Sequence, residues 1–96
     1  MMDMEKIEEL FDACVDDFMN FDSIENKRSN RPDLHAFLLL DSLFPGNDDM
    51  VCAAGHDIIY LNVEMDDFQK IATEELILEL LRCGVCYDED SLAIST

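Results

Sequence analysis

The sequence predicts an α+β fold in one domain spanning residues 1–96, with two N-terminal helices, a β-hairpin, a C-terminal helix and a last short strand in two layers. Apolar residues recur three and four positions apart up to about residue 44, shorter strand-like runs follow residue 50, and helical spacing returns after residue 64. The 96 residues suit one domain, and no repeat or low-complexity linker divides them.

The first helix is predicted over Met4 to Phe21. Its apolar residues alternate between spacings of three and four, which is typical of an amphipathic helix packed on a core. The expected core side is formed by Met4, Ile7, Phe11, Cys14 and Phe18, widened by Leu10, Val15 and Met19.

A second helix is predicted to begin near Pro32, because proline at the first helical position loses no hydrogen bond, and to end at the turn sequence PGN. It is apolar over a wide arc, so we expect it to be heavily buried. His35 lies in this helix and is interpreted as packed rather than catalytic. The arc consists of Leu34, Phe37, Leu38 and Leu40.

The C-terminal half changes period twice. MVCAA and DIIYLNV flank GHD and predict the hairpin. MDDFQKIATEELILELLRCG then predicts one or two helices, with Thr73 or Met65 as a cap and Gly84 as the terminating glycine. VCYDEDSLAIS favours a last strand on either side of DED.

Charge is the most unusual property of the chain. Hydrophobic residues make up 49% and include six Phe, so this is a folding sequence and not a disordered acidic tail. The formal charge of −17 far exceeds the magnitude of roughly 2 to 8 that keeps a small domain soluble. Phosphates would be repelled, which argues against direct binding to nucleic acid or an anionic membrane and favours a basic protein partner.

The acidic residues follow the predicted elements. In the first helix they fall about once per turn, ~5 Å apart along the axis, whereas duplex DNA carries one charge per ~1.7 Å. Two or three such rows side by side would approach the duplex. This surface is either simply solvated or binds a basic surface. The candidate partner-binding residues are Glu5, Glu8, Glu9, Asp12, Asp16, Asp17, Glu64, Asp66, Asp67, Glu74, Glu75, Asp88, Glu89 and Asp90.

The cysteines and histidines allow a zinc set formally, with Cys52 and His56 as C-x3-H and Cys83 and Cys86 as C-x2-C. Neither half resembles a paired knuckle. Free, mostly buried thiols are the preferred interpretation, and we expect no bound metal or cofactor. CGVC closes a helix rather than opening one, which argues against thioredoxin-like chemistry.

Catalytic frames are missing as well. There is no G-x-S-x-G sequence, no EF-hand loop and no glycine-rich phosphate loop among three glycines in all, so we expect that the protein is not an enzyme. No signal-peptide pattern opens the chain and no apolar run approaches ~20 residues. We therefore expect a cytoplasmic protein.

The short chain, the acidic excess on a well-patterned fold and the helix MEKIEELFDACVDDFMNF together resemble the DNA-mimic inhibitors of bacteriophages and mobile elements, of the anti-restriction and anti-CRISPR type. HDIIYLNVEMDDF and LLRCGVCYDEDSLAI are similar in style to small phage proteins. The resemblance implies an inhibitor, working in the host cytoplasm, that blocks the nucleic-acid-binding surface of a basic host protein such as a restriction enzyme, Cas effector or transcription factor.

A basic linker departs from this resemblance. Lys27, Arg28 and Arg31 stand close together, and we interpret them as pairing with acids of the first helix or of a second subunit. Two other functions stay open. One is an immunity or antitoxin protein that neutralises a basic nuclease, and the other is a zinc-stabilised or dimeric adaptor domain. Whether the chain forms a homodimer stays open as well.

Overall fold

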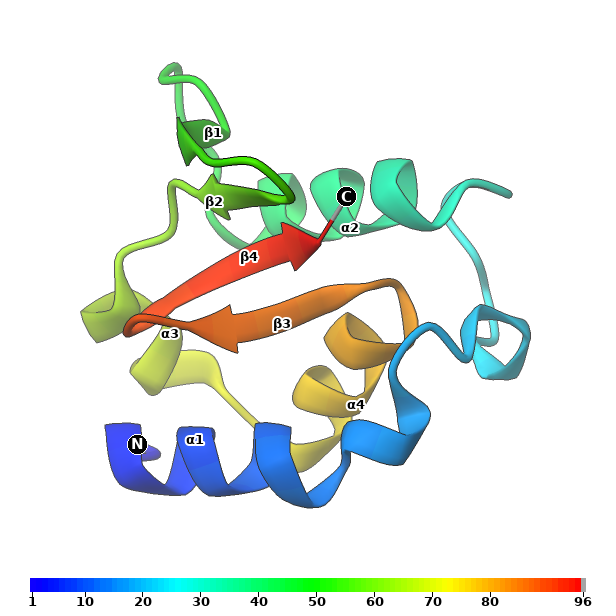
Figure 1. Cartoon of the computed structure of the whole chain (residues 1–96), viewed down its shortest axis with the longest axis horizontal. Coiled ribbons are helices and arrows are strands. Elements are labelled where there is room, and N and C mark those ends of the chain that lie inside the picture. Colours follow the sequence, from blue (N-terminus) through cyan, green and yellow to red (C-terminus); the bar gives the residue numbers. More distant parts are fainter. Residues whose placement is uncertain (96) are drawn as a thin grey trace.

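The computed structural model describes residues 1–95, and within them four α-helices and four β-strands form an α+β fold, as predicted (Figure 1). Their order is α1 Met4–Ala13, α2 Pro32–Leu43, β1 Val51–Ala54, β2 Ile58–Leu61, α3 Met65–Ile71, α4 Glu74–Arg82, β3 Val85–Asp88 and β4 Ser91–Ser95, with short 3-10 turns η1 Val15–Asp17 and η2 Phe21–Ser23 after α1.

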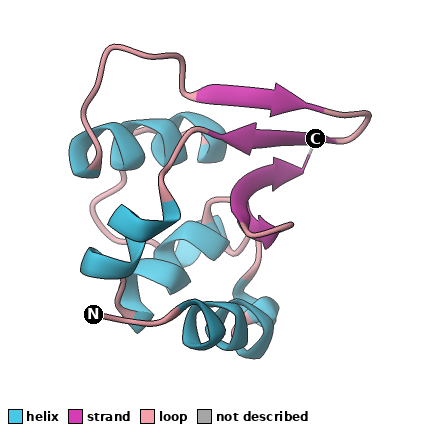
Figure 2. Ribbon diagram, turned by 90° about the vertical axis from the view of Figure 1, so that its left-hand side faces the viewer, coloured by secondary structure: helices cyan, strands magenta, loops and turns pink. Residues whose placement is uncertain are grey.

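The strands form one antiparallel sheet in the order β1-β2-β4-β3, so β4 lies between two earlier strands. In Figure 2 the helices lie to one side of the strands, which gives the two predicted layers. The core is buried between these layers. Each of α1, α2, α3, α4 and β4 contributes a fully buried side chain to it, namely Ile7, Leu40, Phe68, Leu80 and Leu92.

The prediction that the first helix continues to Phe21 is wrong, because α1 ends at Ala13. Beyond it, β-branched Val15 loses side-chain entropy in a helix, and Asp16 and Asp17 are poor helix formers placed at the negative end of the helix dipole. The chain there turns through η1 and η2 instead of extending the helix.

The end of the predicted apolar stripe consequently leaves the core. Met19 takes a left-handed conformation, with φ of 63°, and donates its backbone N–H to the carbonyl oxygen of Leu81 at 2.9 Å. Val15, Phe18 and Met19 are 56%, 36% and 52% exposed. The core side of α1 is therefore shorter than its sequence pattern suggests.

The second helix begins at Pro32 and stops before PGN, as predicted, but it is less buried than its composition suggests. Leu40 is fully buried and Phe37 is half-buried, whereas Leu34 and Leu38 are 43% and 40% exposed. The reason is that α2 packs on the molecule through one face only. His35, Ala36, Leu39 and Leu40 lie on that buried face, and Leu34 and Leu38 lie outside it.

The helical region after the first hairpin is divided into α3 and α4. The side chain of Thr73 caps α4 by accepting the N–H of Leu76 at 3.0 Å. Met65 is the first residue of α3 and not its cap, which is Glu64 without a side-chain hydrogen bond. Gly84 follows the end of α4 with φ of +95°, the left-handed conformation expected of a terminating glycine.

Where the sequence predicts one last strand, β3 and β4 form a second hairpin across DED. Its two-residue turn consists of Glu89 and Asp90, with φ of 48° and 60°. Two successive positive φ values are typical of the type I′ turn, which matches the twist of the flanking strands. Tight strand pairing thus holds two acidic residues in a conformation that usually favours Asn and Gly.

Candidate partner-binding surface

The acidic side of α1 faces solvent. Glu5, Glu8, Glu9 and Asp12 are all exposed, while the buried residues Ile7, Leu10 and Phe11 line the other side of the helix. Asp16, in η1, is exposed as well. The last turn of α1 contains no basic residue, so the Asp12 carboxylate lies uncompensated near the negative end of the helix dipole.

Asp17 differs from its neighbours because it helps to hold the fold together. Its Oδ1 accepts a hydrogen bond from Nε of Arg82 at 3.2 Å, with both side chains 29% exposed, and this pair ties η1 to the end of α4. From the sequence pattern, we expect the acidic side chains of the first helix to contribute nothing to the fold. For Asp17 that interpretation is wrong.

Tyr87 brings together acids from α1 and from the β3–β4 turn. Its hydroxyl donates to Oδ1 of Asp90 at 2.8 Å, and its ring stacks on Phe11 with centroids 5.9 Å apart. Burial, the hydrogen bond to Asp90, and the negative charges of Asp90 and Glu8 together raise the pKa of Tyr87 to about 12. Glu8 and Asp90 therefore act on the same phenol from different elements.

Tyr60 on β2 plays the matching role for Asp88 on β3. Its hydroxyl donates to Oδ2 of Asp88 at 2.7 Å, reaching across β4. That hydrogen bond, loss of hydration, and the charges of Asp88 and Glu89 raise the pKa of Tyr60 to about 12. Both tyrosines thus use carboxylates of YDED as acceptors, a role the sequence did not predict.

A second acidic cluster surrounds a pocket of about 220 Å³ near the start of α3. Its carboxylates belong to the predicted residues Glu64 and Asp67 and to three residues outside the predicted set, Asp41, Asp48 and Asp49. Asp67 also pairs with Lys70 at 3.6 Å. The signal that could have found two of the three is the pair of aspartates directly after PGN.

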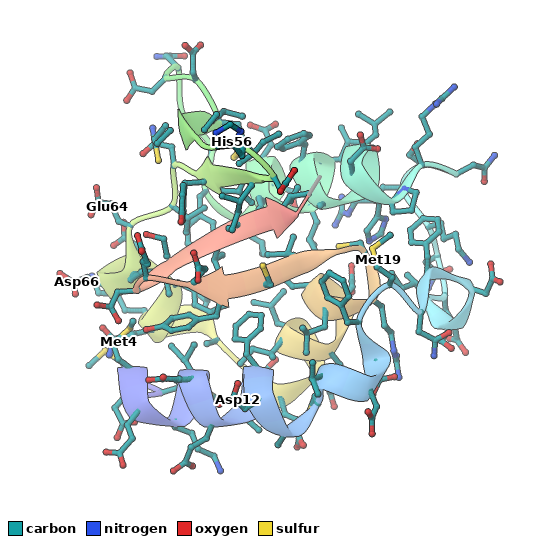
Figure 3. All side chains as sticks on the ribbon, in the orientation of Figure 1. Met4, Asp12, Met19, His56, Glu64 and Asp66 are labelled. Atoms are coloured by element: carbon teal, nitrogen blue, oxygen red, sulfur yellow. The ribbon has the colours of Figure 1, made fainter. Side chains whose placement is uncertain are left out.

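Asp66 is exposed in the first turn of α3. Figure 3 places Glu64 and Asp66 at the same end of the molecule as Met4, where the N–H of Met2 also donates to the carbonyl oxygen of Gln69 at 3.0 Å. The acids of α3 and the start of α1 therefore share one end of the protein.

Glu74 and Glu75 occupy the first turn of α4, where negative charge is favourable for the helix dipole. Glu75 also borders a groove of about 280 Å³, together with Glu25, Glu79 and Arg82. These two predicted residues have a structural reason for their charge, and they lie on a separate region from the cluster around Tyr87.

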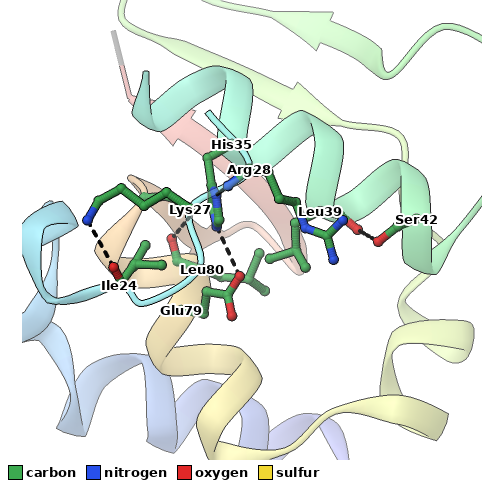
Figure 4. A network of polar contacts seen from close by, with 9 residues as sticks. Ile24, Lys27, Arg28, His35, Leu39, Ser42, Glu79 and Leu80 are labelled. Carbon is green, nitrogen blue, oxygen red and sulfur yellow. Dashed lines mark hydrogen bonds and ion pairs between the residues drawn. The ribbon is translucent and has the colours of Figure 1, made fainter. Parts of the chain in front are cut away.

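His35 is buried, in agreement with the interpretation that it is packed. Its Nδ1 accepts the backbone N–H of Arg28 at 3.1 Å, and its Nε2 lies 2.9 Å from Oε2 of Glu79 (Figure 4). The Arg28 contact requires that Nε2 carries the hydrogen, so Nε2 donates to the carboxylate. The histidine thereby connects α2, α4 and the preceding linker.

The cysteines and histidines selected by spacing do not assemble into a metal site. Among residues 1–95, no group of three or more His, Cys, Asp or Glu side chains could hold a metal ion. Cys83 is buried, and burial raises its thiol pKa to about 12, while Cys52 is exposed on β1. Burial also raises the pKa of Cys86. All four cysteines are free thiols.

The basic linker does not neutralise the acids of α1. Lys27 donates to the carbonyl oxygen of Ile24 at 2.9 Å, and its ammonium lies 5.2 Å from the ring centroid of Phe21. In the part of the chain that the structure describes, neither Arg28 nor Arg31 forms an ion pair with a carboxylate. The expectation of an intrachain pairing is therefore wrong.

Within the described chain, no helix combines the length and the apolar character needed to cross a membrane. Comparison with protein-family models, with curated proteins and with solved structures finds no match to this chain.

Proposed function

We propose that this chain is an acidic interaction protein that blocks the nucleic-acid-binding surface of a basic protein, as the DNA mimics of bacteriophages do. Its carboxylates would lie where the phosphates of DNA or RNA otherwise bind. The mechanism is competitive occlusion in the cytoplasm of the host cell, without catalysis.

The solvent-facing acids of α1 support the proposal most directly. Glu5 and Glu9 lie four residues apart, as do Glu8 and Asp12, and like charges at this spacing destabilise a helix by a few tenths of a kcal/mol per pair. Asp12 also lies at the unfavourable end of the helix dipole. Glu5 lies in the first turn, where negative charge is favourable. Because the charges of Glu8, Glu9 and Asp12 weaken the helix, stability does not explain them, whereas a cationic partner does.

The balance of ion pairs supports the same function. Between residues 1 and 95, ion pairs join Arg82 to Asp17 and Lys70 to Asp67. The contact of His35 with Glu79 is a hydrogen bond from Nε2, because Nδ1 of the same ring accepts the N–H of Arg28. Most of the 23 acidic residues of the sequence therefore have no basic partner in this region. A field of this sign accelerates association with a cationic protein at low salt and weakens as salt is added.

To test this proposal, the protein is immobilised and exposed to a lysate of the host. The captured proteins are then eluted with duplex DNA or with increasing NaCl. We expect the captured proteins to be mainly nucleic-acid-binding proteins that either eluent releases. Captured proteins that do not bind nucleic acid, or capture that neither DNA nor salt reverses, would overturn the proposal.

A charge-reversed variant then locates the surface. Glu8→Lys, Asp12→Lys and Asp16→Lys combined should leave the protein folded and abolish capture. The matched control changes Asp22, Asp48 and Asp49 to Lys, three exposed acids outside the candidate set, which alters net charge equally and should retain most of the capture. Equal loss in both variants would show that net charge, and not the face of α1, governs binding.

A further inference from the structure

The outward face of α2 presents two exposed leucines between two opposite charges. Leu34 and Leu38 are 43% and 40% exposed, and both point away from the buried side of the helix. Arg31 precedes Leu34 by three residues and Asp41 follows Leu38 by three, and both are exposed. At helical spacing these four residues form one stripe, ~15 Å long from Arg31 to Asp41.

The two charges of this stripe stand at the ends of α2 where they weaken the helix. Arg31 is the N-cap residue and Asp41 lies in the last turn, so each faces the pole of the helix dipole that has its own sign. Neither side chain forms an ion pair with another residue of the described chain. Interactions within one molecule therefore do not account for this arrangement.

We propose that α2 packs antiparallel against α2 of a second copy of this chain, about a two-fold axis that passes near residue 36. In such a pair, a residue of one copy faces the residue of the other copy whose number is 72 minus its own. Leu34 then packs on Leu38 of the second copy, and Arg31 reaches Asp41 of the second copy. Two-fold symmetry repeats both contacts, as an isologous interface requires.

Charge complementarity identifies the second copy as the occupant. The antiparallel arrangement opposes the two helix dipoles and places each basic N-terminal end beside an acidic C-terminal end. Asp48 and Asp49 border the same pocket as Asp41 and so extend the acidic end, while Lys27 and Arg28 precede the basic end along the chain. A face that is basic at one end and acidic at the other, with leucines between, complements itself under this symmetry.

The segment of chain that forms this face is also far less acidic than the rest of the sequence. Between residues 27 and 49 there are three Lys or Arg and four Asp or Glu, a net charge of −1, so the other residues hold −16 of the total of −17. At physiological ionic strength, charges more than ~8 Å apart are largely screened. Pairing through α2 directs the strongly acidic α1 of each copy to the outside. The proposed function of α1 therefore does not depend on whether this dimer forms.

Sedimentation equilibrium of the full chain over a range of concentrations tests the proposal with two charge variants. In Arg31→Asp the contact between the two copies becomes Asp against Asp, and in Asp41→Arg it becomes Arg against Arg, so each variant alone should associate at least about tenfold more weakly than the unaltered protein. In an equimolar mixture, one copy of the mixed pair has Asp at both positions and the other has Arg at both. Each of the two contacts then joins an Asp to an Arg again. The mixture should therefore form heterodimers.

A leucine pair of variants separates packing from charge. Leu34→Gln with Leu38→Gln should reduce association, whereas Leu43→Gln, which changes a 37% exposed leucine at the end of the same helix, should not. An unaltered protein that stays monomeric at millimolar concentration would overturn the proposal. So would charge variants that associate as the unaltered protein does, or a mixture that fails to recover association.

Discussion

The imidazole of His35 on α2 and the carboxylate of Glu79 on α4 meet at 2.9 Å, with the histidine buried and the glutamate side chain 36% exposed. The other ring nitrogen accepts the backbone N–H of Arg28 at 3.1 Å. A single side chain therefore satisfies the polar groups of two different segments, and this explains why a histidine stands within an apolar helix.

Replacing His35 by Ala should lower the free energy of unfolding by about 3 kcal/mol, because it leaves a cavity and an unpaired N–H at Arg28. Glu79→Gln keeps an acceptor for Nε2 at a partly exposed site, so its cost should stay below about 1 kcal/mol. Urea unfolding followed by circular dichroism measures both. Equal costs would mean that the charge of Glu79, and not the packing of His35, provides the stability.

The two tyrosines should make the protein sensitive to alkali. In the folded state the pKa of Tyr60 and that of Tyr87 are each raised to about 12, while an unfolded tyrosine titrates near 10. The folded protein thus holds these protons more tightly. The resulting stability is fully present below pH ~10 and is lost as the pH rises toward 12.

Absorbance at 295 nm can follow this titration directly, since the chain has two Tyr and no Trp. The control is the double variant Tyr60→Phe with Tyr87→Phe, compared by urea unfolding at pH 8 and pH 11. The double variant should lose less stability between pH 8 and pH 11 than the unaltered protein. Burial also raises the pKa of Cys83, and this contributes to the loss in both proteins. Identical losses would show that the tyrosine contacts do not persist in solution.

Gly84→Ala should destabilise the protein by about 2 kcal/mol. Its φ of +95° is unfavourable for a residue with a Cβ, and an added Cβ would lie 2.8 Å from Sδ of Met19. Combining it with Met19→Ala removes the second cause and should recover part of the loss. Gly46→Ala is the matched control, with nothing within 4 Å, and should stay within ~0.5 kcal/mol. Thermal unfolding distinguishes the three variants.

Opposite ends of α1 should respond oppositely to loss of an acid. Oδ1 of Asp3 accepts the N–H of Lys6 at 2.8 Å as the helix cap, so Asp3→Ala should cost about 1 kcal/mol. Asp12→Lys removes repulsion with Glu8 and compensates the dipole, and should add about 0.5 kcal/mol. Thermal unfolding of the two variants measures both effects. A loss on changing Asp12 would indicate a structural contact and would weaken the case for a partner at this face.

Local signals predicted much of the fold. Pro32 begins its helix, Thr73 caps α4, and Gly84 ends it, because each of these effects acts within one turn of the chain. Val15, Asp16 and Asp17 are local signals against continuing α1, but the path of the chain beyond the helix could not be predicted in the same way. It depends on where Leu81 and Arg82 lie in space, more than 60 residues further along the chain, and the spacing of apolar residues contains no information about them.

The candidate surface was predictable in composition but not in arrangement. The sequence identified Glu64 and Asp67 but could not show that the fold brings Asp41, Asp48 and Asp49 to the same pocket. Nor could it show that Asp88 and Asp90 accept hydrogen bonds from tyrosines. A carboxylate held by a tyrosine and one that is free look the same in a sequence. For Asp88 the difference lies in pairing across the sheet, and for Asp90 it lies in the conformation of the β3–β4 turn.

The position of β4 between β2 and β3 sets the order in which this protein can mature during translation. Neither neighbouring strand has its central partner until residues 91–95 have been synthesised and have left the ribosome. Until then the nascent chain exposes two unpaired strand edges as well as the apolar side of every helix that packs on the sheet. Closure of the sheet is therefore a late step of folding, and a chain truncated before residue 91 keeps two unpaired strand edges that a cell's proteases can recognise as unfinished.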